Sequence, residues 1–94
     1  MNWINEDFIK CTTKAFVYEI TICKNNQTFY YIGYKLLKGK WKSYISSSKY
    51  IKNDKDFITE KRILRVFDDV DAAMKYEFDL INELDAVKSE TFYN

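Results

Sequence analysis

The fold is decided by residues 14–34, which read KAFVYEITICKNNQTFYYIGY. Residues 14–23 alternate with the period of two that is typical of a strand, and one apolar face carries Phe16, Tyr18, Ile20 and Ile22. Residues 24–27 predict a turn, because asparagine tolerates the left-handed backbone that tight turns need. Residues 28–34 predict a second strand. Together these residues predict an antiparallel hairpin.

The segments that flank the hairpin are less regular. Residues 1–13 form a lead-in, in which the helical spacing of three apolar residues predicts a short helix against the core: Trp3, Ile4 and Phe8. Residues 35–43 predict a basic loop, and residues 44–53, which contain three consecutive serines, predict a short helix.

The remainder of the chain predicts a strand followed by a longer helix. Residues 60–67 are rich in apolar side chains and predict the third strand. Asp68 and Asp69 then offer an N-cap, so we expect a helix from about Val70 to Asp85. The order β-β-α-β-α predicts an α+β fold, in which a small three-stranded antiparallel sheet is flanked by helices in one domain of residues 1–94.

Composition narrows the chemistry that the chain can perform. It contains no His, which excludes His-based acid–base catalysis, Ser-His and Cys-His nucleophiles, and most zinc sites. Any catalysis must therefore use Tyr, Lys, Arg or carboxylates.

No apolar run approaches the roughly 18 residues of a membrane span, and the first residues lack the pattern of a signal peptide. We therefore expect a cytoplasmic protein without a membrane partner, in which Cys11 and Cys23 are reduced.

Charge is distributed unevenly along the chain. Residues 1–55 hold ten Lys and four acidic residues, whereas residues 56–94 hold five basic and ten acidic residues. This division favours a positive face that binds a polyanion. The alternative is that the lysines are solvated and serve solubility, because the net charge of +1 is low for a nucleic-acid-binding protein.

Two tyrosines are the first candidate functional residues. Tyr18 and Tyr31 lie on adjacent strands of the predicted hairpin, where cross-strand neighbours can meet on one face. Two phenols that converge over a metal site could order and deprotonate a water molecule. The alternative is ordinary aromatic packing, which is common in a chain with eight Tyr. Gly33 ends the second strand and lets the backbone approach another group closely.

Glu77 is the candidate that does not depend on the hairpin. It falls on the apolar face of the last predicted helix, which we assign to Val70, Ala73, Met74, Ile81 and Leu84. A carboxylate that faces a core is costly unless it is paired, hydrogen-bonded or bound to a metal. The alternative is that Glu77 lies at the edge of this face and reaches water.

Lysines and aromatic residues are mixed in the predicted basic loop and in the short helix after it. Such a mixture suits phosphate contacts combined with base stacking on Trp41 and Tyr44. The alternative is a solvated loop in which Trp41 packs on the core. The candidate nucleic-acid-binding residues are Lys35, Lys40, Lys42, Lys49 and Lys52.

In this order and spacing, the candidate residues resemble the GIY-YIG nuclease family. The resemblance covers about residues 15–94 and is greatest to short phage-type homing-endonuclease-like reading frames. It is carried by Phe16-Val17-Tyr18, Tyr31-Ile32-Gly33, Tyr44-Ile45-Ser46-Ser47-Ser48-Lys49, Arg62-Ile63-Leu64, Glu77 and Tyr93-Asn94.

The resemblance implies a metal-dependent DNA endonuclease, a hydrolase encoded by a bacteriophage. One of Tyr18 and Tyr31, supported by the other, would activate the attacking water. Glu77 would hold a single Mg²⁺ or Mn²⁺, and Asn94 would help to order the site. DNA is then the expected partner, in the cytoplasm of a bacterial host.

Three departures from the family pattern leave a second function open. The first motif lacks its glycine, and serines replace the glycines of the third. No arginine lies on the first helix, so Lys49 and Lys52 are the candidates to supply a positive charge there. Lysine cannot reproduce the two-pronged phosphate contact of arginine. The alternative is therefore a catalytically impaired module that binds a host protein or nucleic acid, as a phage regulatory or counter-defence factor.

Overall fold

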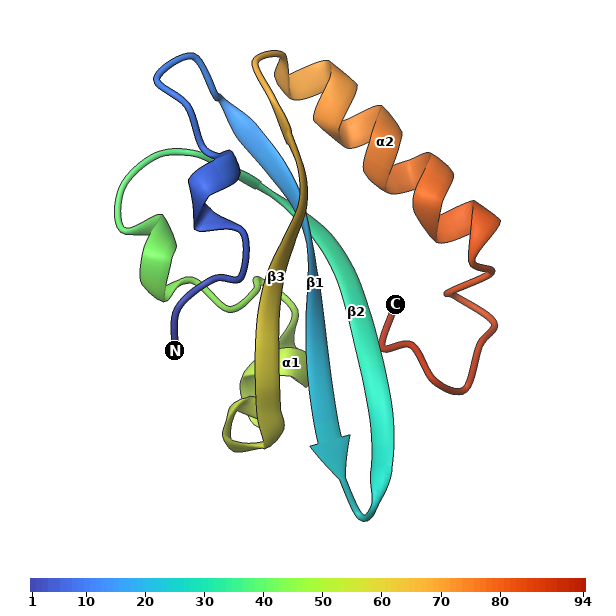
Figure 1. The fold of residues 1–94 in the computed structure, drawn as a ribbon. Helices are drawn as coiled ribbons and strands as arrows, with labels where there is room; N and C mark the ends of the chain where they lie inside the picture. Colours follow the sequence, from blue (N-terminus) through green and yellow to red (C-terminus); the bar gives the residue numbers. More distant parts are fainter.

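The computed structural model describes residues 1–94. Its strands and α-helices are β1 (Ala15–Lys24), β2 (Gln27–Leu36), α1 (Lys49–Asn53), β3 (Ile58–Phe67) and α2 (Val70–Glu83). Single-turn 3₁₀ helices lie at Glu6–Phe8, Trp41–Ser43 and Lys55–Phe57. The strands form one antiparallel sheet in the order β2-β1-β3 (Figure 1). The predicted α+β class and the order β-β-α-β-α are confirmed.

The hairpin forms as predicted, except that its second strand is longer and reaches Leu36. Asn25 and Asn26 have φ values of 55° and 63°, which is the backbone of a two-residue hairpin turn. The turn sets the register, so that Tyr18 lies opposite Gly33 and Ile20 lies opposite Tyr31. Register decides which side chains share a face, because neighbouring residues on a strand point to opposite faces.

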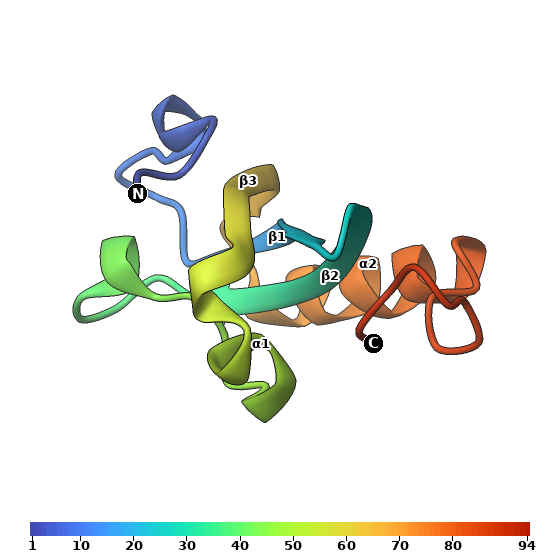
Figure 2. The same cartoon turned by 90° about the horizontal axis from the view of Figure 1, so that it is seen from below.

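The sheet has a core on each face. The larger core contains the face of β1 that the sequence predicted, together with residues from the N-terminal segment, α1 and β3: Trp3, Phe16, Tyr18, Ile20, Ile22, Ile51, Ile58 and Ile63. The smaller core lies under α2 and contains Ala15, Val17, Ile32 and Ala73. The N-terminal segment and α2 consequently lie on opposite sides of the sheet (Figure 2). None of the helices has the length and apolarity needed to cross a membrane.

The N-terminal segment does not form the expected helix. Only the single turn Glu6–Phe8 is helical, and Phe8 is exposed. The physical reason is a competing strand-like pairing: the Ile4 amide donates to the Lys61 carbonyl, and the Ile63 amide donates to the Ile4 carbonyl. Trp3 is nevertheless buried in the larger core, so the predicted packing of this segment holds without the helix.

One other boundary, and the buried face of the last helix, differ from the sequence prediction. The expected helix over residues 44–53 is shortened to α1, because the Ser46 hydroxyl accepts the Ser48 amide at 3.0 Å in a local turn. In α2, Asp69 caps the helix as expected by accepting the Asp71 amide at 3.1 Å. The face assigned to this helix was partly wrong, because Met74 and Leu84 are exposed.

Candidate active site at the edge of strand β2

Tyr18 and Tyr31 meet on the same face of the hairpin. Their ring centroids are 6.3 Å apart, with the rings tilted by 42°. Tyr18 is only 1% exposed, and burial raises the pKa of its phenol well above the ordinary value. Tyr31 is half-buried, and burial also raises the pKa of its phenol. Tyr31 is therefore the phenol of the pair that can reach solvent.

Gly33 makes room for Tyr18. A Cβ atom at residue 33 would lie 2.4 Å from the Tyr18 phenol oxygen and 2.5 Å from its Cζ atom. Both distances are far shorter than ordinary van der Waals contact. The close approach that the sequence predicted at this glycine is thus made by a neighbouring side chain, and only glycine permits it.

Tyr44 and Ser46 enclose the Tyr18 phenol from the segment before α1. The Tyr44 ring packs edge-on against Tyr18, with centroids 6.1 Å apart. Ser46 is 2% exposed, and hydrogen bonding to its hydroxyl lowers the pKa of both Tyr18 and Tyr31, opposing the larger effect of burial. The sequence predicts no separate role for Ser46, whose only signal is its place between Tyr44 and Lys49.

The C-terminal segment adds to the outer edge of β2. The Tyr30 amide donates to the Thr91 carbonyl, and the Tyr93 amide donates to the Tyr30 carbonyl, each at 2.8 Å. Asn94 then continues the pairing with its side chain: Oδ1 accepts the Ile32 amide at 2.9 Å, and Nδ2 donates to the Ile32 carbonyl at 2.7 Å. The Asn94 carboxamide therefore replaces a peptide group of a pairing strand.

Glu77 reaches the same edge of β2 from α2. Its side chain is half-buried next to the backbone amide of Tyr34, the next outward-facing amide after Ile32. Burial raises the pKa of the Glu77 carboxyl, and the Tyr34 amide partly opposes this shift. The negative charge of Glu77 in turn contributes to the raised pKa of Tyr31. Glu77 and Tyr31 are therefore electrostatic neighbours, although they come from opposite sides of the sheet.

Glu77 has no ion-pair partner. The ion pairs of the structure join Lys24 to Asp54, Arg62 to Glu60, and Lys75 to Asp79. No group of three or more His, Cys, Asp or Glu side chains is suitably placed to hold a metal ion. An unpaired, partly desolvated carboxylate fits a hard cation that takes one protein ligand and completes its shell with water and phosphate oxygens. Glu77 is the one candidate residue that fits this description.

Lys35 is the cation that the structure places beside the tyrosines. It follows Gly33 by two residues on β2 and therefore shares the face of Tyr31. Its Nζ atom lies 4.7 Å from the centroid of the Tyr44 ring. Lys49, which the sequence proposed for this role, instead lies exposed with its Nζ atom 5.5 Å from the ring of Tyr50.

The other predicted nucleic-acid-binding lysines are exposed and lack acidic partners. They are Lys40, Lys42 and Lys52, and the Lys42 ammonium lies 5.8 Å from the Trp41 ring. The two arginines lie on the other face of the sheet, paired in register with Val17 and Glu19. Arg62 contacts Glu60, and Arg65 lies 5.4 Å from the rings of Phe67 and Tyr76. Neither arginine faces the tyrosines.

A polar cluster that the sequence does not predict anchors the C-terminal segment. The Tyr93 hydroxyl donates to Asp54 Oδ2 at 2.6 Å, and Lys24 Nζ lies 3.1 Å from Asp54 Oδ1. Lys24 and Tyr93 lie 30 and 39 positions from Asp54 in the chain, so no local sequence pattern predicts the contact. The cluster holds the segment that presents Asn94 to β2.

Comparison with known proteins identifies no relative: no family model matches the chain, and neither a curated protein nor a solved structure matches it. Membership of the GIY-YIG family therefore stays a prediction. The site itself is a surface at the edge of a strand, because neither of the two cavities in the structure is lined by Tyr18, Tyr31 or Glu77.

Proposed function

We propose that this protein is a metal-dependent DNA endonuclease of the GIY-YIG type, encoded by a phage and acting in the cytoplasm of its bacterial host. The observation that carries the proposal is the packing of Tyr31 on Tyr18 along β2, with Glu77 of α2 beside the Tyr34 amide of the same strand. Tyr18 packs against Tyr31, and the Asn94 side chain is hydrogen-bonded to the backbone of Ile32, the residue after Tyr31 on β2.

Tyr31 is the residue that would position the attacking water, because it is the more exposed of the two phenols. Tyr18 would support it by packing. Mg²⁺ or Mn²⁺ bound at Glu77 would polarise a DNA phosphate and neutralise its developing charge. Burial is the main cause of the raised pKa of Tyr31, and neutralising Glu77 would remove the smaller contribution of its negative charge. The phenol would then release its proton more readily and serve better as a base.

Lys35 would contact the phosphate in place of the missing arginine. It lies on the face of Tyr31 and has no acidic partner. An ammonium group acts as a point charge and lacks the planar fork of arginine, so the expected cleavage is slow. The exposed lysines would bind the DNA backbone, and Trp41 would stack on a base.

Nicking of supercoiled plasmid in Mg²⁺ or Mn²⁺ tests the proposal. Glu77→Gln removes the negative charge and keeps a side chain of the same size, so we expect a loss of about 10²-fold or more in rate. Glu83→Gln is the matched control, because Glu83 is exposed on the same helix and should leave the rate unchanged. Equal rates for the wild type and Glu77→Gln would refute the role of Glu77.

A second candidate is a binding module without nuclease activity, whose partner is a host protein or nucleic acid. It is favoured by the enclosure of Tyr18, which is 1% exposed beneath Tyr44, and by the absence of arginine from that face. If the folded wild type retards labelled DNA in a gel but does not cut it in either metal, the protein binds DNA without cleavage. If it does neither, affinity capture from host extract becomes the informative experiment.

A further inference from the structure

Residues 38–53 form a basic surface that contains no acidic residue. The chain has no Asp or Glu between Glu19 and Asp54. The lysines of the basic surface are all exposed, and they are Lys38, Lys40, Lys42, Lys49 and Lys52. The ammonium groups that form hydrogen bonds or ion pairs in the structure belong to other lysines, namely Lys10, Lys24, Lys61 and Lys75. The charges of the basic surface are therefore free to contact phosphate groups.

Two aromatic rings accompany these charges. Tyr50 of α1 is 60% exposed. Trp41 is half-buried, and its ring centroid lies 5.7 Å from that of Phe16 in the larger core. Tyr44, on which the sequence placed base stacking, instead packs on Tyr18 with centroids 6.1 Å apart. Trp41 and Tyr50 are consequently the rings of the basic surface that a ligand can reach.

Both rings lie on the side of the sheet away from α2. Trp41 packs against the larger core, and Ile51, which follows Tyr50 on α1, belongs to that core. The helix α2 covers the smaller core on the opposite face. In Figure 1 the segment from Trp41 to α1 lies to the left of β2, and α2 lies to its right. The acidic residues of α2 are therefore kept apart from the lysines of the basic surface.

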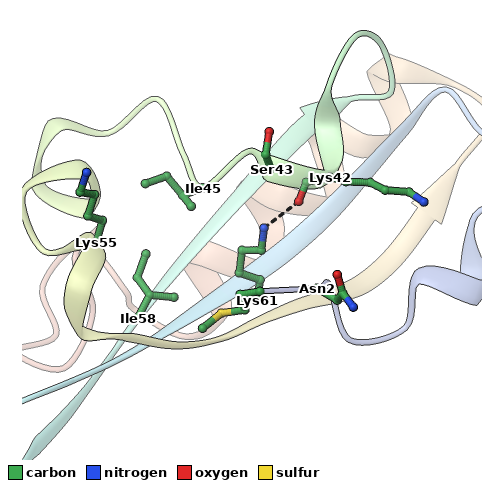
Figure 3. Close-up of a pocket in the computed structure, with 8 residues that line it drawn as sticks. Asn2, Lys42, Ser43, Ile45, Lys55, Ile58 and Lys61 are labelled. Atoms are coloured by element: carbon green, nitrogen blue, oxygen red, sulfur yellow. Dashed lines mark hydrogen bonds between the residues drawn. The ribbon is translucent and has the colours of Figure 1, made fainter.

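The backbone that carries Trp41 is held from beneath by two buried side chains. Trp3 Nε1 donates to the Trp41 carbonyl at 3.3 Å, and Lys61 Nζ donates to the carbonyls of Lys42 and Tyr44 at 2.9 and 3.2 Å. Figure 3 shows the Lys42 carbonyl bound to Lys61, while the Lys42 side chain points away from it. These bonds fix residues 41–44 before a ligand arrives, which lowers the entropy cost of binding.

Aromatic rings beside free cations favour a single strand over a duplex. In a duplex each base is stacked between its neighbours, whereas an unpaired base can stack on an aromatic side chain. The Lys42 ammonium lies 5.8 Å from the centroid of Trp41, and the Lys49 ammonium lies 5.5 Å from that of Tyr50. Exposed cation–π contacts of this kind are weak, so each ammonium can turn from its ring to the phosphate of a stacked nucleotide.

We propose that the basic surface binds single-stranded DNA, with bases stacked on Trp41 and Tyr50 and with the phosphates on its lysines. The inference deepens the DNA-binding part of the proposed function and rests on it for the choice of DNA as the ligand. It does not require that the protein cleaves DNA. The surface accepts strands of any sequence, because every base has a face that can stack.

Fluorescence anisotropy with a labelled oligothymidylate of about 12 nucleotides, in EDTA, tests the proposal. We expect this single strand to bind at least about tenfold more tightly than a duplex of the same length. Tyr50→Ala should weaken single-strand binding about tenfold, whereas Tyr50→Phe keeps the ring and should bind like the wild type. Phe78→Ala is the matched control, because Phe78 is similarly exposed, at 65%, but lies on α2. It should leave the affinity unchanged.

Two further readouts locate the strand on the protein. The chain has two tryptophans, of which Trp3 is 3% exposed, so Trp41 is the one that DNA can reach. Single-stranded DNA should quench part of the tryptophan emission, and Trp41→Phe should remove this quenching. Lys42→Gln should reduce the slope of log affinity against log salt by about 0.7, because one phosphate contact is lost. Lys75→Gln, on α2, should leave that slope unchanged.

Three results would each overturn the proposal. They are a duplex affinity that equals or exceeds the single-strand affinity, equal losses in Tyr50→Ala and Phe78→Ala, and an absence of quenching that depends on Trp41. Because Tyr50 and Phe78 are exposed, both alanine variants should fold. Plasmid nicking without a preference for single strands would reject this role of the basic surface and leave the endonuclease standing. Single-strand binding without nicking would support the basic surface and reject the endonuclease.

Discussion

Replacing Gly33 with Ala is expected to destabilise the protein through a single contact. The new Cβ would lie 2.4 Å from the Tyr18 phenol oxygen, 2.5 Å from Cζ and 3.0 Å from Cε2. The ring cannot retreat, because Trp3 and Tyr44 pack against it with centroids 5.3 and 6.1 Å away. Overpacking of this kind costs about 1–3 kcal/mol in unfolding free energy.

A double-mutant cycle measured by urea unfolding tests this reasoning. Leucine at residue 18 lacks all three of the atoms that the new Cβ would meet. Gly33→Ala should therefore cost under about 0.5 kcal/mol in the Tyr18→Leu background, because the coupling disappears with the contact. The same cost in both backgrounds, or no cost in the wild type, would refute the assignment of Gly33 to Tyr18.

Gly39→Ala is the matched control for this cycle. Gly39 has a φ of +64° and no atom within 4 Å of its built Cβ. Its replacement should cost about 1–2 kcal/mol through left-handed backbone strain alone. That cost should be the same with Tyr or Leu at residue 18, since no contact with Tyr18 is involved.

The C-terminal segment gives the remaining predictions. Asn94→Ala leaves the Ile32 amide and carbonyl without partners, so we expect a loss of about 1–3 kcal/mol and faster hydrogen exchange of the Ile32 amide. The hydrogen bond from Tyr93, together with Lys24, lowers the pKa of Asp54 below its unfolded value of 3.8. The ionised Asp54 therefore stabilises the fold above pH 3.8, and this stabilisation is lost as the pH falls through the lower pKa of the folded state. Burial, together with the hydrogen bond to Asp54, raises the pKa of Tyr93 from 10.0 to about 12. The protonated Tyr93 therefore stabilises the fold below pH 10, and this stabilisation is lost as the pH rises towards 12. Tyr93→Phe should reduce the pH dependence of the unfolding free energy at both the acid and the alkaline end, when unfolding is measured as a function of pH. An unchanged pH dependence would contradict the pairing of Tyr93 with Asp54.

Local patterns were sufficient for the hairpin and the last helix. The alternation of residues 14–23, the two asparagines of the turn and the aspartate cap of α2 are each encoded within a few neighbouring residues. The convergence of Tyr18 and Tyr31 follows from hairpin register, which is itself local. These features could be predicted because their physical cause lies in adjacent residues.

The N-terminal segment shows where local patterns fail. Its apolar spacing predicted a helix, but pairing of Ile4 with β3 uses the same backbone groups. Met74 is exposed, although its spacing assigned it to the buried face of α2. Apolar periodicity shows which residues share one side of a helix, but it does not fix how the helix is rotated against the sheet. Only packing between distant segments decides such cases.

The sequence by itself determined the order of strands and helices, the shared face of the two tyrosines, and the unusual position of Glu77 on its helix. Tertiary structure alone decided that Glu77 meets the edge of β2, that Asn94 completes that edge, and that Lys35 is the cation beside the tyrosines. It also decided the burial of Lys61. The physical reason is that each of these contacts joins residues far apart in the chain, whose approach depends on the packing of the whole sheet.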